Sequence, residues 1–168
     1  MPSLRRTIPN SFTLSNLVCG IFSISFAMNE YYSMSSLLIF LAALFDLLDG
    51  KLARMLKVDD NEIGIELDSL ADIVSFGVAP AILVYSMLTH QTQHASFLLN
   101  LAFISFPIAG AWRLGRFNVS PTRGYFLGVP ITLAGLIVAA LAFFGIANPF
   151  IMMILAALMV SKLRLPKI

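Results

Sequence analysis

The stretch DLLDGKLARMLKVDDNEIGIELDSLAD occupies residues 46–72 and sets aspartates at regular intervals among apolar, helix-forming residues. Asp46 and Asp49 are three positions apart and Asp68 and Asp72 are four apart, so each pair shares one face of a helix. Two antiparallel helices joined by the intervening loop would bring Asp46 to the depth of Asp72. The same arrangement would bring Asp49 to the depth of Asp68. The stretch therefore predicts a helical hairpin that gathers four carboxylates.

The composition of the whole chain is typical of a membrane protein. The chain has 168 residues, of which 58% are hydrophobic and 12% are charged, and its mean hydropathy is +0.87. Soluble domains carry about 25% charged residues, and disordered chains combine low hydrophobicity with high charge. Both classes are therefore excluded. A membrane crossing takes roughly 20 residues, so the chain is long enough for several.

Net charge and cysteine content limit the possible partners further. The formal net charge is only +2, which gives no reason to expect nucleic acid as a partner. Cys19 is the single cysteine, so the chain can form neither an internal disulfide nor a cysteine-based zinc cluster.

Six apolar segments are candidates for membrane crossings, at about 11–28, 33–56, 65–88, 96–116, 127–147 and 149–163. With six crossings, all eleven lysines and arginines fall near helix ends on one side of the membrane. Cytoplasmic loops carry the excess of these residues. We therefore predict an all-α bundle of six transmembrane helices with both termini cytosolic.

The domain organisation expected from this pattern is simple. Residues 1–10 are interpreted as a cytosolic or interfacial lead-in to one membrane domain covering residues 1–168. The compact length favours a multi-pass protein of a prokaryotic cell membrane.

Aspartates are energetically unfavourable inside such a bundle. Each costs roughly 2.5–3.5 kcal/mol near the centre of a membrane helix, and like charges at short range repel one another. Divalent cations would offset both costs, and hard oxygen ligands suit Mg²⁺ or Mn²⁺. Four carboxylates suffice for two ions about 3.5–4 Å apart. The alternatives are salt bridges to arginines across the bundle and a proton or cation pathway.

Small residues and one arginine accompany the aspartates. Gly50, Ala53 and Gly64 could open space for a ligand, or could serve tight helix packing instead. Arg54 follows Gly50 by one helical turn, and its guanidinium fork suits a phosphate. The pattern indicates a metal-dependent site, open to the cytosol, for a phosphate-bearing substrate.

The two halves of residues 46–72 resemble the signature of the CDP-alcohol phosphatidyltransferases. That signature reads D-x-x-D-G-x-x-A-R, then G-x-x-x-D-x-x-x-D, and residues 46–54 and 64–72 match all its fixed positions. The spacer covers residues 55–63, one residue more than is usual. The stretch IPNSFTLSN (8–16) resembles the family's first-helix pattern. RLGRFN (113–118), followed by YFLGVP (125–130), resembles the phosphatidylserine synthase branch, with Gly115 and Val129 as mild departures.

The resemblance implies a reaction and its metal ligands. A phosphatidyl group passes from CDP-diacylglycerol, or from an archaeal ether-linked CDP-lipid, to an alcohol, and CMP is released. Asp46, Asp49 and Asp68 would bind one divalent ion, and Asp46, Asp68 and Asp72 a second. Asp72 would also be the general base that takes the proton of the incoming hydroxyl. Family members span the membrane six times, often as homodimers, with a cytosol-facing site.

The resemblance also implies the contacts to the CDP-lipid. Gly50, Ala53 and Arg54 would border the CDP moiety, and Thr13 and Asn16 would line the same pocket.

The acceptor expected for this branch is L-serine, whose carboxylate needs a cationic partner. Arg113 and Arg116 lie three residues apart at the cytosolic end of the fourth segment, with Asn118 beside them. Either arginine could bind the serine carboxylate or a lipid phosphate. The alternative is that both are snorkelling anchors at the membrane surface.

Other functions stay open on sequence alone. The same chemistry could serve glycerol phosphate or inositol phosphate as acceptor. Intramembrane aspartates could also form the ion pathway of a cation transporter, or belong to a purely structural membrane scaffold.

Overall fold

The computed structural model describes residues 2–56, 62–119 and 125–166. Helix dominates these ranges, with one turn of π-helix inside the third helical segment. The elements in chain order are α1 (Pro2–Met28), α2 (Tyr32–Met55), α3 (Glu62–Asp72), the π-helical turn η1 (Ile73–Val78), α4 (Ala79–Thr92), α5 (Phe97–Val119), β1 (Tyr125–Leu127), α6 (Ile131–Phe143), α7 (Pro149–Val160) and β2 (Arg164–Pro166).

The helices match the apolar segments predicted from sequence in order and approximate position. Among the described residues, three helical stretches are long and apolar enough to cross a membrane: Thr7–Met28 in α1, Ile63–Thr92 through α3, η1 and α4, and Phe97–Val119, which is α5. The apolar helices α6 and α7 have 13 and 12 residues. At 1.5 Å per residue they reach roughly 20 Å, short of a hydrocarbon core about 30 Å thick. The three long apolar stretches indicate a membrane-embedded chain. Six crossings and cytosolic termini stay predictions.

Two boundaries differ from the sequence-based expectation. Helix α1 already begins at Pro2, so most of the lead-in expected over residues 1–10 is helical and continuous with the first apolar span. The fifth apolar segment forms helix α6, which begins at Ile131 and not near residue 127. Gly128, with a φ of +72°, and the extended Pro130 hold the preceding residues out of the helix.

The all-α prediction is confirmed for the described residues, apart from one short two-stranded ribbon. Strands β1 and β2 pair antiparallel, with Phe126 opposite Leu165. The backbone N–H of Gly128 continues this link by donating to the carbonyl oxygen of Leu163 (2.9 Å). The ribbon ties the chain before α6 to the chain after α7.

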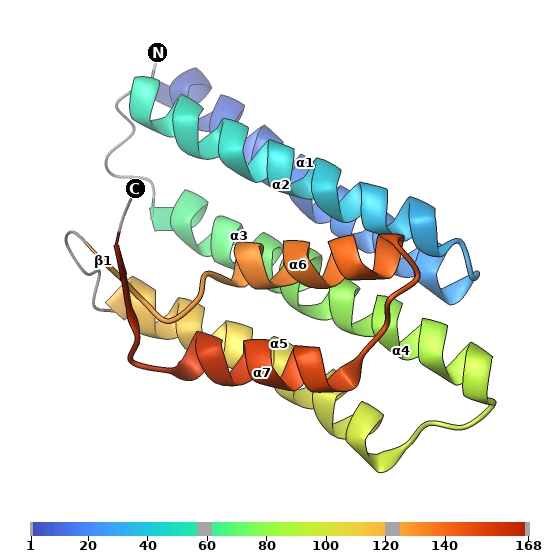
Figure 1. Ribbon diagram of the computed structural model, residues 1–168. Helices are drawn as coiled ribbons and strands as arrows, with labels where there is room; N and C mark the ends of the chain where they lie inside the picture. The colour runs from blue at the N-terminus through green and yellow to red at the C-terminus, as the bar shows by residue number, and fades with distance from the viewer. Residues whose placement is uncertain (1, 57–61, 120–124, 167–168) are drawn as a thin grey trace.

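Figure 1 shows α1 and α2 side by side as a long antiparallel pair, with the continuous rod α3–η1–α4 next to it. Helix α5 lies beyond that rod and packs mainly on α7, and α6 packs on α2 and η1. The beginning of α1, the end of α2, the beginning of α3 and the β-ribbon all lie at one end of the bundle. This shared end holds the candidate site.

The π-helical turn is closely packed against its neighbours. Ser75 and Phe76 are fully buried, and the Ser75 hydroxyl donates to the backbone carbonyl of Asn16 on α1 (3.0 Å). Glycines from two neighbouring helices meet the turn at very short range: Gly20 faces Ser75, and Gly135 faces Phe76. Because η1 directly follows Asp72, this packing fixes the end of the helix that carries the site.

The close approach of α6 to η1 predicts a stability effect. A methyl group added at Gly135 would lie 2.6 Å from the carbonyl oxygen of Phe76, which is backbone and cannot rotate away. Gly135→Ala should destabilise the fold by about 1–3 kcal/mol, as overpacked cores do, and lower the midpoint of thermal unfolding in detergent. Gly115→Ala is the matched control, because a methyl group there meets nothing within 4 Å. Equal midpoints for the two variants would contradict this packing.

Candidate metal centre and active site

The site is built around three aspartates contributed by two helices. Asp46 lies on α2, and Asp68 and Asp72 lie one turn apart on α3. One carboxylate oxygen from each residue lies within 4.8 Å of the others, so a single cation could contact all three. Asp72 is buried, with 7% of its surface exposed, and the other two are partly buried. The convergence expected from the helical spacing is therefore present for these three.

Asp49 lies apart from that trio and is held by the first helix. The hydroxyl of Thr13 lies 2.7 Å from Asp49 Oδ2 and 3.2 Å from the carbonyl oxygen of Pro9, one turn earlier in α1. Both Thr13 and Asp49 are buried. A hydrogen bond of this length to a carboxylate restrains its orientation. The structure thus brings Asp49 to the edge of the cluster, against α1.

Asp72 has an α1 partner of its own. The amide Nδ2 of Asn16 donates to Asp72 Oδ1 over 3.4 Å. Asn16 is fully buried, and its Oδ1 atom has no hydrogen-bond partner among the described residues. Thr13 and Asn16 are three positions apart, so one face of α1 presents a polar group to each side of the acidic cluster.

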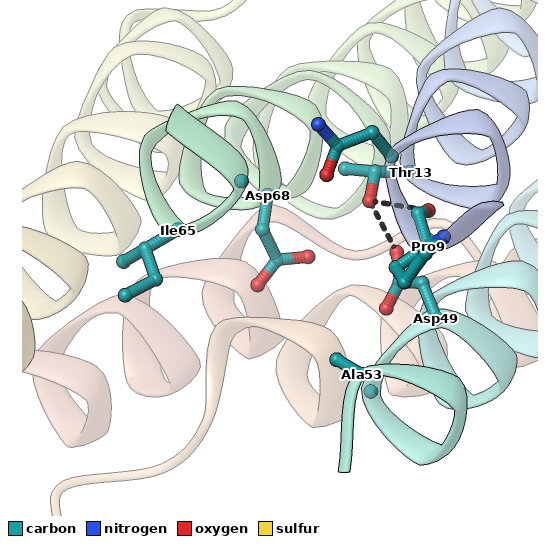
Figure 2. Close-up of a pocket in the computed structure, with 9 residues that line it drawn as sticks. Pro9, Thr13, Asp49, Ala53, Ile65 and Asp68 are labelled. Atoms are coloured by element: carbon teal, nitrogen blue, oxygen red, sulfur yellow. Dashed lines mark hydrogen bonds between the residues drawn. The ribbon is translucent and has the colours of Figure 1, made fainter. Parts of the chain in front are cut away.

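A cavity of about 140 Å³ opens beside the aspartates (Figure 2). Figure 2 shows the Asp68 and Asp49 carboxylates pointing into the space between α3 and α2, with Thr13 above them on α1. The lining comes from the first three helical segments: Pro9, Asn10, Thr13, Asp49, Gly50, Ala53, Gly64, Ile65 and Asp68.

Three of these lining residues, Pro9, Asn10 and Ile65, were not singled out from sequence. Their signal was the helical spacing, since Asn10 precedes Thr13 and Ile65 precedes Asp68 by three positions.

The cavity decides between the two interpretations of Gly50. A methyl group at this position would meet nothing within 4 Å, so Gly50 is not needed for close helix packing. It leaves space at the wall of the cavity instead. Arg54, one turn later, is exposed, and its Nε donates to the Gly50 carbonyl oxygen (3.0 Å). Arg54 and Asn16 are not among the lining residues, whereas Thr13, Gly50 and Ala53 are.

The three residues predicted to bind the acceptor have different surroundings. Arg113 on α5 is buried, with 7% of its surface exposed, and interacts electrostatically with Asp72. Arg116 donates to carbonyl oxygens at the C-terminal end of α7, including that of Val160 at 3.1 Å. Asn118 donates to the hydroxyl of Ser69 on α3 (2.9 Å). Only Arg113 is therefore directed at the acidic cluster.

The residues present fit a divalent cation. All donors in the trio are carboxylate oxygens, the ligands that Mg²⁺ and Mn²⁺ prefer. Asp68 Oδ1 is buried and has no hydrogen-bond partner in the described ranges. Among the described residues, no lysine or arginine forms an ion pair with Asp46, Asp68 or Asp72. The salt-bridge alternative has no support there, and the cluster could bind a metal ion.

Comparison with known proteins gives a family match along nearly the whole chain. The model of the family described as CDP-alcohol phosphatidyltransferase matches residues 6–162. A Bacillus subtilis protein named CDP-diacylglycerol–serine O-phosphatidyltransferase is 35% identical over 164 residues, which cover 95% of this chain and 89% of the relative.

Two archaeal relatives are similar at the same level. A Methanocaldococcus jannaschii protein with the same name as the Bacillus subtilis relative is 35% identical, covering 99% of this chain and 78% of its own length. A Methanothermobacter thermautotrophicus protein named archaetidylserine synthase is 33% identical, covering 96% of this chain and 70% of its own length.

The geometry of the three aspartates predicts that replacing one of them weakens metal binding. Asp68→Asn removes one charge and one strong oxygen ligand from the cluster. Loss of an outer-shell partner alone weakens metal binding about 10- to 100-fold, so loss of this ligand should weaken Mn²⁺ binding by at least that factor. Titration of free Mn²⁺ by electron paramagnetic resonance measures this directly. Glu66→Gln, an exposed change two residues away on the same helix, is the matched control. Equal Mn²⁺ affinity in the two variants would contradict the assignment.

Proposed function

The chain belongs to the CDP-alcohol phosphatidyltransferase family, and from that premise we propose that it transfers a phosphatidyl group from CDP-diacylglycerol to L-serine. The observation that carries the proposal is the convergence of Asp46, Asp68 and Asp72 beside a cavity lined by residues of the family signature. Serine as acceptor is supported by the names of the bacterial and archaeal relatives. The serine branch resemblance in residues 113–118 points the same way.

The reaction is a displacement at phosphorus. The serine hydroxyl oxygen forms a bond to the phosphorus that carries the lipid, and the bond from that phosphorus to the bridging oxygen of CMP breaks. The products are phosphatidylserine and CMP. An ether-linked CDP-lipid would react in the same way, since the chains lie away from the diphosphate.

Asp72 is the proposed general base. A serine hydroxyl is a poor nucleophile near neutral pH, so its proton must pass to a nearby acceptor as the new bond forms. Asp72 is buried, and the amide of Asn16 restrains its Oδ1 atom. This contact supports a positioning role for Asn16, in addition to the proposed CDP contact that the resemblance implies.

Four aspartates are the proposed metal ligands. Asp46, Asp49 and Asp68 would hold one ion, and Asp46, Asp68 and Asp72 a second. Bound Mg²⁺ or Mn²⁺ would neutralise the diphosphate and stabilise negative charge on the CMP leaving group. Thr13 supports this arrangement because it fixes one Asp49 oxygen at 2.7 Å.

The nucleotide end of the donor is proposed to occupy the cavity between α2 and α3. Gly50 and Ala53 form a wall without bulky side chains, and Thr13 adds a polar group. Arg54, exposed at the end of α2, is placed to pair with a phosphate or nucleotide oxygen at the mouth. Positioning of the two substrates for in-line attack then supplies much of the rate.

The proposed setting is the prokaryotic cell membrane, with the site facing the cytosol. The distribution of lysine and arginine supports this orientation. The start of α1, the end of α2, the start of α3 and the β-ribbon share one end of the bundle (Figure 1). A homodimer, as implied by the family resemblance, is part of the same proposal.

An assay of CMP release tests the proposal. Purified protein in detergent, given CDP-diacylglycerol and Mn²⁺ or Mg²⁺, should release CMP on addition of L-serine and stop when EDTA is added. Asp72→Asn should lower the rate by about 10²- to 10⁴-fold, the range supplied by a general base. His90→Gln changes an exposed side chain that pairs with Glu30, away from the acidic cluster, and should keep the wild-type rate.

Two outcomes would contradict the proposal. CMP release with glycerol phosphate or inositol phosphate, but not with L-serine, would remove serine as acceptor and keep the chemistry. Cation flux into vesicles without turnover of any CDP-lipid would favour the transporter alternative.

A further inference from the structure

Arg113 is a buried cation that forms no ion pair with any described carboxylate. Its side chain lies on α5 with 7% of its surface exposed, and its Nε atom has no hydrogen-bond partner among the described residues. No described carboxylate lies within 4.0 Å of its guanidinium nitrogens. A buried guanidinium that is not neutralised is costly, so a site that keeps one is suited to an anionic ligand.

The surroundings of Arg113 direct it to the acceptor side of the site. Its charge interacts with that of Asp72, the proposed base. Helix α5 packs on η1, the turn after Asp72, whereas the described lining of the nucleotide cavity comes from α1, α2 and α3. Figure 1 shows α5 across the α3–η1–α4 rod from α1 and α2. Arg113 therefore belongs to a helix that lies across the rod from α1 and α2, and it is not among the described residues that line the donor cavity.

The chemistry of serine requires such a neighbour for the base. Only two carbon atoms separate the hydroxyl oxygen of L-serine from its carboxylate carbon. A cation that binds the carboxylate must therefore lie within a few ångströms of the group that takes the hydroxyl proton. A guanidinium matches a carboxylate with two parallel hydrogen bonds, which fixes orientation as well as affinity.

We propose that Arg113 alone binds the carboxylate of the acceptor amino acid and selects it over acceptors without that group. This inference rests on the proposed function, because it specifies how serine is recognised at the same site. The guanidinium carbon lies over the ring of Phe117, 5.9 Å from the ring centroid and within cation–π range. Arg113 thus offers a buried guanidinium whose charge interacts with that of Asp72.

Arg116 has a different role in spite of its place in the same motif. Its guanidinium donates to the carbonyl oxygens of Met159 (3.5 Å), Val160 (3.1 Å) and Ser161 (3.3 Å). These carbonyls end α7 and lack partners within the helix. Arg116 therefore fastens α7 to α5 and is a structural residue. Asn118 likewise holds α5 to Ser69 on α3.

The test compares two acceptors that differ only in the anionic group. L-Serinamide keeps the hydroxyl and amine of L-serine but replaces the carboxylate by a neutral amide. Arg113→Gln should lower the ratio of kcat/KM for L-serine to kcat/KM for L-serinamide by at least about 30-fold, the lower bound for loss of a buried charged partner. The lower ratio should come from a higher KM for L-serine, while KM for the CDP-lipid should change by less than about threefold.

Arg116→Gln is the matched control. It should lower the midpoint of thermal unfolding and reduce turnover of both acceptors by the same factor, which leaves their ratio constant. If Arg113→Gln shows no cooperative unfolding transition, Arg113→Lys decides, because lysine keeps the charge and loses the fork. A ratio lowered at least fivefold in that variant would support the inference.

Three results separate the possible failures. A constant acceptor ratio in a folded Arg113 variant would overturn the assignment of Arg113 and leave the proposed function intact. An Arg113 change that raises KM for the CDP-lipid as much as KM for L-serine would assign the arginine to a donor phosphate and overturn the inference. A wild-type protein that never uses L-serine but releases CMP with another alcohol would refute the proposed function itself.

Discussion

Mutual repulsion among clustered carboxylates is the constraint on which the rest of this structure depends. Asp46, Asp68 and Asp72 present oxygens within 4.8 Å of one another in an apolar bundle. Charges at this distance interact strongly where water is scarce, and the described residues supply no ion pair to offset them. A cluster of this kind is stable in its charged form only with cations bound, so fold and metal chemistry are coupled.

The neighbouring helices hold the cluster in place rather than neutralise it. Thr13 and Asn16 on α1 give Asp49 and Asp72 neutral hydrogen-bond donors, which orient an oxygen without cancelling its charge. The π-helical turn after Asp72 is fixed by glycine contacts from α1 and α6. On α5, the Arg113 charge interacts with that of Asp72. This division lets one set of aspartates face both a nucleotide lipid and a small polar acceptor.

Much of this arrangement was predictable from sequence, for reasons that lie in local geometry. Aspartates three and four positions apart must share a helix face, and the apolar runs around them set the helices and their order. The π-helical turn was not predictable, because the inserted residue leaves no break in the hydrophobic pattern. Arg113 and Arg116 also look alike in sequence. Their different roles become visible only in the structure, where Arg116 donates hydrogen bonds to the carbonyl oxygens at the end of α7. The β1–β2 ribbon depends on pairing between segments far apart in the chain.

Anomalous scattering from crystals grown with Mn²⁺ would show whether the carboxylate cluster is a divalent-metal site. We expect anomalous peaks in direct contact with carboxylate oxygens of Asp46, Asp68 and Asp72, at about the 2.0–2.2 Å typical of small divalent ions. The same crystals from an Asp68→Asn variant should lose at least one peak. Wild-type crystals whose Mn²⁺ peaks all lie elsewhere, with a lysine or arginine side chain paired to the three aspartates, would contradict the account.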